Sequence, residues 1–148
     1  GTAPAPRLLQ NPDEPAPREW GLRLDPDALA ALREGLRRVT QQGGTAYLSS
    51  LELWDLLGKT GTGQNPLSVA GLAEDHAWFA GMAGPPGGPP EIVIAALVEY
   101  GAHGSSAAAP IVAKAADYYL RTKYGIPVDT IQTLGEHIAV GRWPEWAR

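Results

Sequence analysis

The stretch Gly-Lys-Thr-Gly-Thr-Gly-Gln at residues 58–64 opens the part of the sequence that decides the fold. We expect a strand near Lys59, a second, aromatic-apolar strand over residues 77–82 and a third, largely apolar strand over residues 91–100. The run Gly-Pro-Pro-Gly-Gly-Pro-Pro at residues 84–90 forces a turn between the second and third strands. These signals predict a three-stranded antiparallel meander.

A helix is expected on the N-terminal side of this meander. Asp-Pro-Asp at residues 25–27 offers an N-cap, a proline at the first helical position and an acid in the first turn. Leucine and valine then recur at helical spacing, and Gly-Gly at residues 43–44 is a stop signal. We therefore predict a helix over residues 26–41.

A second helix is expected after the third strand. The apolar run Ile-Val-Ile-Ala-Ala-Leu-Val at residues 92–98 predicts a strand that is buried on both faces. Beyond it, Ser105 or Ser106 is expected to cap a helix over residues 107–122. Gly125 would end that helix. Helices on both sides of the meander indicate an α+β fold.

Composition limits the possible functions. The 148 residues are 44% hydrophobic and 19% charged, which is typical of a folded domain. A net charge of −4 with scattered basic residues argues against nucleic acid as a partner. The lack of cysteine excludes disulfides, thiolate-bound zinc and a thiol nucleophile. The longest apolar run is far shorter than the ~20 residues of a membrane helix, and no leader peptide is visible, so we expect any anchor to lie outside these residues.

The motifs together point to a family. The chain resembles the C-terminal part of the transpeptidase domain of class B penicillin-binding proteins, most closely the elongation type (penicillin-binding protein 2-like). Three stretches in the same order and spacing carry the resemblance: residues 58–64, Asp-His-Ala-Trp-Phe at 75–79, and Glu-Tyr-Gly-Ala-His-Gly-Ser-Ser-Ala-Ala-Ala-Pro at 99–110. Glu-Gly-Leu at 34–36 and Gly-Thr-Ala at 44–46 also match. The resemblance implies a partial penicillin-binding/β-lactamase-like transpeptidase fold, whose Lys-Thr-Gly is one of three signature motifs.

The resemblance implies a role for each residue of this motif. When a serine attacks a peptide or β-lactam carbonyl, a negatively charged oxygen develops that rigid backbone N–H groups stabilise. Thr62 would supply one such N–H group. Lys59 and the hydroxyls of Thr60 and Thr62 would hold the carboxylate of the stem peptide. Gly61 would let the strand lie close to the substrate, so its substitution should abolish binding.

The other two signature motifs of the family, Ser-x-x-Lys and Ser-x-Asn, do not occur in these 148 residues. None of the five serines is followed by a lysine three positions later; they are Ser49, Ser50, Ser68, Ser105 and Ser106. An activated serine needs an adjacent base. We therefore expect the isolated chain to show no turnover and no covalent β-lactam adduct, whereas the parent protein would be a serine D-Ala-D-Ala transpeptidase.

Other interpretations remain. A class D-type β-lactamase or β-lactam sensor shares Lys-Thr-Gly but lacks the context at residues 75–78 and 103–104. A non-catalytic interaction module is the second alternative. A phosphate-binding loop is rejected, because Leu53 stands where that motif requires glycine.

Several residues near the motifs are expected to be structural. His76 and His103 each stand without a partner at ligand spacing, so we expect structural hydrogen bonds and neither a metal nor a cofactor. Asp75 is expected to make a turn contact. Trp78 and Phe79 are expected to pack in the core.

The resemblance also implies partners and a location. The intact parent would bind peptidoglycan stem peptides and β-lactams beside a membrane-embedded elongation glycosyltransferase. It would lie on the periplasmic or extracytoplasmic side of the membrane, anchored by an N-terminal helix outside this chain. The first strands of its sheet would come from elsewhere, so the free edge of residues 92–98 predicts a homodimer of the isolated chain. We divide the chain into a Pro-rich lead-in (1–19), the transpeptidase portion (20–124) and a C-terminal tail (125–148).

Overall fold

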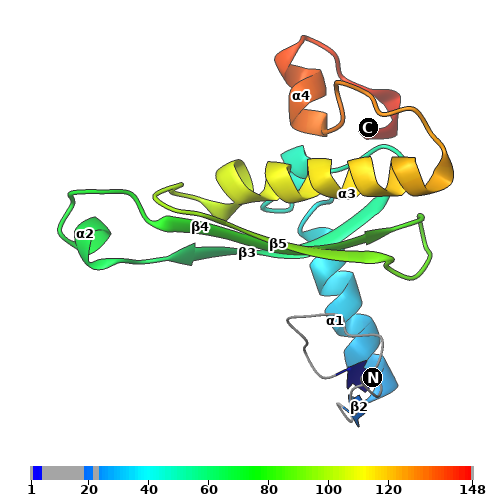
Figure 1. The fold of residues 1–148 in the computed structure, drawn as a ribbon, viewed down its shortest axis with the longest axis horizontal. Helices are drawn as coiled ribbons and strands as arrows, with labels where there is room; N and C mark the ends of the chain where they lie inside the picture. Colours follow the sequence, from blue (N-terminus) through cyan, green and yellow to red (C-terminus); the bar gives the residue numbers. More distant parts are fainter. Residues whose placement is uncertain (1, 5–18, 22–23, 148) are drawn as a thin grey trace, which may run out of the picture. The chain divides into compact units, whose positions relative to one another are not determined.

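The computed structural model describes residues 2–4, 19–21 and 24–147 (Figure 1). The chain divides into two units, residues 1–32 and 33–148. In the first unit, β1 (Thr2–Pro4) pairs antiparallel with β2 (Glu19–Gly21). The lead-in expected at residues 1–19 lies mostly outside the described residues.

Helix α1 (Pro26–Arg38) begins where the sequence predicts. The Asp25 carboxylate accepts a hydrogen bond from the Asp27 amide at 2.9 Å, and Pro26 occupies the first helical position. The helix ends earlier than the expected residue 41. The following turn brings Gly44 against the last helical turn, where a Cβ would lie 2.1 Å from the Arg38 carbonyl oxygen.

The predicted meander is confirmed. Strands β3 (Asp55–Gly63), β4 (His76–Gly84) and β5 (Ile92–Val98) form an antiparallel sheet in the order β3-β4-β5. The short helix α2 (Pro66–Val69) lies on the connection between β3 and β4 (Figure 1). The Gly-Pro-rich turn closes with a 2.8 Å bond from the Glu91 amide to the Ala83 carbonyl. Because each connection is short, neighbouring strands in the sequence are neighbours in the sheet.

One face of the sheet packs against α3 (Ala109–Tyr124) and forms the core (Figure 1). Phe79 is completely buried there together with Val112 and Leu120 from the helix. The expectation that Phe79 packs in the core is confirmed. The same expectation for Trp78 is wrong, because alternate side chains of a strand point to opposite faces and Trp78 is 46% exposed.

The expectation that residues 92–98 are buried on both faces is also wrong. Burial alternates along β5, and Val93 and Leu97 are 74% and 47% exposed. Their partners across the sheet, Met82 and Trp78, lie on the same face. The apolar run therefore behaves as a half-buried strand whose covered face is the one toward α3.

A π-helical turn, η2 (Gly104–Ala108), precedes α3, and this changes how the helix begins. The predicted serine cap is wrong: the Ser106 hydroxyl donates to the His103 carbonyl at 3.3 Å, and no side chain caps Ala108. The same carbonyl accepts from the amides of Ser106 and Ala107. At the other end, Gly125 adopts the predicted left-handed conformation, with φ +67°.

No role could be assigned to the tail from its residues alone. In the structure, residues 126–147 pack on α3 on its side away from the sheet (Figure 1). This C-terminal segment contains α4 (Leu134–Ala139) and the 3₁₀ turn η3 (Glu145–Ala147). It contacts the chain before β3, where the 3₁₀ turn η1 (Tyr47–Ser49) lies. The Tyr47 hydroxyl donates to the Ala147 carbonyl at 2.6 Å. This hydrogen bond joins residues that are far apart in the sequence and helps to hold the C-terminal segment in place.

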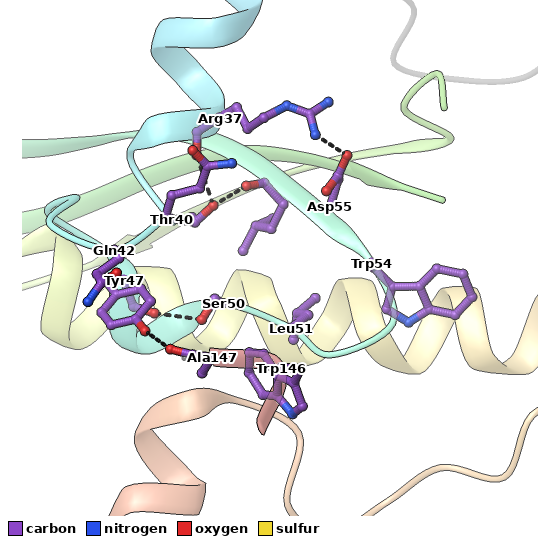
Figure 2. A pocket seen from close by; sticks show the side chains of 12 residues that line it. Arg37, Thr40, Gln42, Tyr47, Ser50, Leu51, Trp54, Asp55, Trp146 and Ala147 are labelled. Atoms are coloured by element: carbon purple, nitrogen blue, oxygen red, sulfur yellow. Dashed lines mark hydrogen bonds and ion pairs between the residues drawn. The ribbon is translucent and has the colours of Figure 1, made fainter. Parts of the chain in front are cut away.

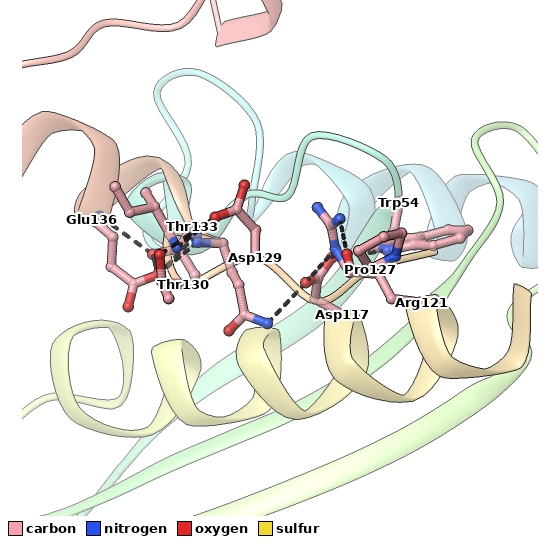
Figure 3. Close-up of polar contacts among 10 residues, drawn as sticks. Trp54, Asp117, Arg121, Pro127, Asp129, Thr130, Thr133 and Glu136 are labelled. Atoms are coloured by element: carbon pink, nitrogen blue, oxygen red, sulfur yellow. Dashed lines mark hydrogen bonds and ion pairs between the residues drawn. The ribbon is translucent and has the colours of Figure 1, made fainter. Parts of the chain in front are cut away.

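A buried polar cluster joins α3 to this segment (Figure 3). Its members are Trp54, Asp117, Arg121 and Gln132. The Asp117 carboxylate accepts from Trp54 Nε1 and Gln132 Nε2, each at 2.9 Å, and from Arg121 Nε at 2.8 Å. Arg121 also donates to the Pro127 carbonyl at 2.8 Å. Because Asp117 is 1% exposed, these donors replace water around its carboxylate.

Glu136, in the first turn of α4, ties this helix to α3. Its carboxylate accepts from Lys114 Nζ at 2.7 Å and from the amides of Gln132 and Thr133 at 2.9 and 3.1 Å. Partial burial alone would raise the pKa of Glu136, but these hydrogen bonds outweigh it and lower the pKa to about 2. The ionised carboxylate is therefore the form that the fold stabilises.

Candidate active site

Strand β3 changes character where the Lys-Thr-Gly motif begins. Leu56, Leu57 and Gly58 are buried, whereas Lys59 and Thr62 are exposed. The first half of the strand therefore anchors it in the sheet and the second half presents the motif to solvent.

The pairing with β4 sets which motif residues share a face. Thr60 lies opposite Phe79 and Thr62 opposite Ala77, both buried residues of the α3 face. Lys59 and Gly61 lie opposite Ala80 and Trp78 and point to the other face. The structure thus brings the two threonines together on one face and places Lys59 on the opposite face.

That edge is free in the described part of the chain, where β3 pairs with β4 alone. An edge strand leaves alternate N–H and C=O groups without a ladder partner. Such groups can bind an extended peptide by adding it to the sheet, or stabilise a developing oxyanion. Here the Lys59 Nζ folds back and donates to the Thr60 carbonyl at 2.6 Å.

Close backbone packing holds the middle of the motif. A Cβ on Gly61 would lie 3.1 Å from Trp78 Cβ, a tight contact with its cross-strand neighbour. A Cβ on Gly104 would lie 2.1 Å from the Trp78 carbonyl oxygen and 2.7 Å from the Gly61 carbonyl oxygen. Gly104 is therefore required for the π-helical turn to reach the backbone of the motif, a role that sequence reasoning missed.

The loop between β5 and this turn is held by His76. Nδ1 of His76 accepts from the Tyr100 amide at 3.1 Å, and the two rings are 5.0 Å apart. This agrees with the expected structural hydrogen bonding of His76. The Asp75 carbonyl accepts from the Ala102 amide at 2.9 Å, in keeping with its expected turn contact. Tyr100 and Ala102 have positive φ, 55° and 61°, a conformation that costs about 1–3 kcal/mol at a non-glycine residue.

The five serines of the described residues lie in different surroundings. The hydroxyls of Ser50, Ser68 and Ser106 donate to backbone carbonyls, and Ser49 is completely buried. Within residues 24–147, no three His, Cys, Asp or Glu side chains gather into a metal site. Among the described residues, none of the helices has the length and hydrophobicity of a membrane span. The motif residues of the described chain therefore offer polar side chains and backbone N–H groups.

A cavity of about 270 Å³ lies at the opposite, buried end of β3 (Figure 2). The end of α1, the chain before β3 and the last turn η3 line it; Arg37, Tyr47 and Trp146 are among its residues. Arg37 forms an ion pair with Asp55, which also accepts from the Gly87 amide at 2.8 Å. None of the motif residues Lys59–Thr62 lines this cavity, so it is separate from the candidate site.

Comparison with known proteins identifies the family. The family model of the penicillin-binding protein transpeptidase domain matches residues 1–117 of the sequence. The chain belongs to the penicillin-binding protein transpeptidase family. The α+β fold of this family member, with its antiparallel sheet and packed helices, is the one that the sequence predicts.

Individual relatives agree. The chain is 35% identical over 105 residues to the peptidoglycan D,D-transpeptidase MrdA of Haemophilus influenzae, which covers 67% of the chain and 15% of that protein. It is 36% identical over 107 residues to MrdA of Acinetobacter baumannii, with 66% of the chain and 15% of the relative covered. The chain therefore spans less than a sixth of the length of these curated relatives.

A solved structure supports the same assignment. The crystal structure of Pseudomonas aeruginosa PBP2 in complex with WCK 5153 is 31% identical in sequence, with a TM-score of 0.59. The match covers 78% of this chain and 24% of the PBP2 chain. The penicillin-binding fold is therefore present in part.

Proposed function

We propose that this chain is the C-terminal portion of a longer peptidoglycan D,D-transpeptidase and forms the Lys-Thr-Gly side of its active site. The parent would cross-link stem peptides by serine acyl transfer through an acyl-enzyme. The nucleophile would come from a Ser-x-x-Lys motif outside these residues. The free, exposed edge of β3 at Lys59–Thr62 is the observation that carries this proposal.

Each motif residue would have a separate task. The Thr62 N–H would stabilise the oxyanion, which needs a rigid donor in a fixed position. Lys59, Thr60 and Thr62 would hold the carboxylate of the stem peptide from both faces of the strand edge, since Lys59 lies on one face and the threonines on the other. Gly61 would keep the substrate side of the strand free of a side chain.

The parent would bind stem peptides and β-lactams and work beside a membrane-embedded elongation glycosyltransferase. It would act on the periplasmic or extracytoplasmic side, anchored by an N-terminal helix outside this chain. The edge of β5 would pair with strands from the rest of the parent, and in the isolated chain it would support a homodimer. The exposed apolar side chains of Val93 and Leu97 favour such an association.

Intact mass after incubation with a β-lactam tests the proposal. The samples are the 148-residue chain, a longer protein extended upstream through the Ser-x-x-Lys motif, and the same longer protein with that serine replaced by alanine. We expect only the unmodified longer protein to gain the mass of the drug. Absence of an adduct on all three would reject the transpeptidase proposal in favour of an interaction module. An adduct on the short chain would show that it carries its own nucleophile.

A further inference from the structure

The loop of residues 99–103, between β5 and the π-helical turn, is held in an unfavourable conformation. Tyr100 and Ala102 both have positive φ, and Gly101 stands between them. A Cβ on Gly101 would lie 2.9 Å from Val98 Cγ1 and 3.0 Å from Ala77 Cβ, so this residue is pressed against the sheet. Strained backbone of this kind persists only where the surroundings hold it, and it clusters at functional sites.

His76 is the side chain that holds this loop. Its Nδ1 accepts the Tyr100 amide, and its ring lies against the Tyr100 ring. An imidazole whose Nδ1 accepts a hydrogen bond carries its ring proton on Nε2, which fixes the tautomer. The contact is exposed, whereas the core residues lie under α3. Its loss should therefore affect the loop more than the stability of the fold.

Both ends of this arrangement reach the Lys-Thr-Gly strand. His76 lies directly opposite Gly63, the residue after Thr62, in the β3–β4 pairing. At the other end of the loop, Gly104 lies against the backbone of Gly61, and there is no space for a Cβ on Gly104. A displacement of the loop would therefore move the peptide group that contains both the Gly61 carbonyl and the Thr62 N–H.

We propose that His76 is a positioning residue of the transpeptidase site. Through the Tyr100 amide it fixes the 99–103 loop, and through Gly104 the loop fixes the backbone at Gly61 and hence the direction of the Thr62 N–H. This inference rests on the proposed function, because the N–H matters only if an oxyanion forms beside it. An oxyanion donor acts only when it is rigid and correctly directed, so a side chain that touches no substrate still controls the reaction rate.

Three variants of the longer protein test this assignment. His76→Asn keeps an acceptor at the same number of bonds from the backbone as Nδ1. His76→Gln is equally polar but carries its acceptor one bond further out, and His76→Leu has no acceptor. The first-order rate constant of β-lactam acylation should fall between about 10- and 100-fold for the Leu and Gln variants. It should stay within about threefold of the unmodified protein for the Asn variant, because the hydrogen bond is retained.

Two further readouts separate positioning from folding. The dissociation constant of the initial non-covalent β-lactam complex should change much less than the acylation rate constant, because Lys59 and Thr60 are untouched. Tm should be similar for all variants. If the Leu variant does not fold, the comparison of Asn with Gln gives the same answer. The proposal would be overturned if the Asn and Gln variants had the same acylation rate constant. It would also be overturned if every variant with a reduced acylation rate constant had a correspondingly reduced Tm, since the effect would then be one on folding.

A measurement on the 148-residue chain keeps this inference apart from the proposed function. Amide signals of Gly61, Thr62 and Gly104 in ¹H–¹⁵N spectra should shift in His76→Gln and not in His76→Asn. Unchanged signals in both variants would reject the coupling of the loop to the motif. If instead the signals shift but the unmodified longer protein is never acylated, the coupling stands and the transpeptidase proposal fails.

Discussion

Replacing Asp117 with alanine removes the shared acceptor of the buried polar cluster. Trp54 Nε1, Arg121 Nε and Gln132 Nε2 all lose their partner at once. The Arg121 side chain is 10% exposed, so its charge stays buried without a counter-ion. Removing one partner of a buried ion pair costs about 3–5 kcal/mol. That is a large share of the roughly 5–15 kcal/mol by which a domain is stable.

The same chain contains a matched control. Glu34 and Arg38 form an ion pair with the same helical spacing and the same 2.8 Å distance between Arg Nε and the carboxylate. Their side chains are 50% and 74% exposed, so water replaces the lost partner. Glu34→Ala should cost no more than about 0.5 kcal/mol. The difference between the two variants therefore reports burial together with the two additional hydrogen bonds that Asp117 accepts.

Urea unfolding followed by circular dichroism measures both free energies without relying on the fluorescence of Trp54. Adding Arg121→Met to Asp117→Ala removes the orphaned cation and should recover part of the lost stability. Equal costs for Asp117→Ala and Glu34→Ala would refute the reasoning, since they would show that the cluster is hydrated or unformed in solution.

Two other changes have effects of defined sign. Since the pKa of Glu136 is lowered to about 2, its contribution is present above its ordinary range and is lost as the pH falls from about 5 toward 2. Tm should fall over this window, and less so in Glu136→Gln; an equal fall in both would rule out Glu136 as the cause. Gly104→Ala forces a Cβ within 2.1 Å of the Trp78 carbonyl oxygen and should destabilise the chain by about 1–3 kcal/mol or more in urea unfolding. Gly35→Ala, where a Cβ meets nothing within 4 Å inside α1, should instead stabilise it by up to about 1 kcal/mol, and a loss in both would contradict the steric argument.

The strands and the start of α1 could be predicted because their signals are local. Asp25 and Pro26 stand beside the helix they begin, and the Gly-Pro-rich run stands between the strands it joins. The exposure of Trp78 and Val93 could not be predicted in this way. Whether a face of a sheet is covered depends on elements far away in the sequence, and an unbroken apolar run does not distinguish the two faces.

The candidate site shows the same division. Lys59–Thr62 could be found as a motif, because the chemistry requires adjacent residues on one strand. The contact of Gly104 with Gly61 and the bond from Tyr100 to His76 join separate strands and loops, so they appear only in the fold. Asp117 and Arg121 are similar: their spacing is that of an ordinary surface ion pair, but in the fold they contact Trp54 and the C-terminal segment and are buried.

That packing bears on where the protein can be shortened. The family match ends at residue 117, inside α3 and at the residue that collects the hydrogen bonds of the buried cluster. Expression to this limit would keep the Asp117 carboxylate and discard Arg121 and Gln132, leaving a bare charge beside Trp54. A boundary after residue 147 would keep the segment that shields α3 from solvent and protease. For this family member, the packed structure continues beyond the limit of recognisable sequence.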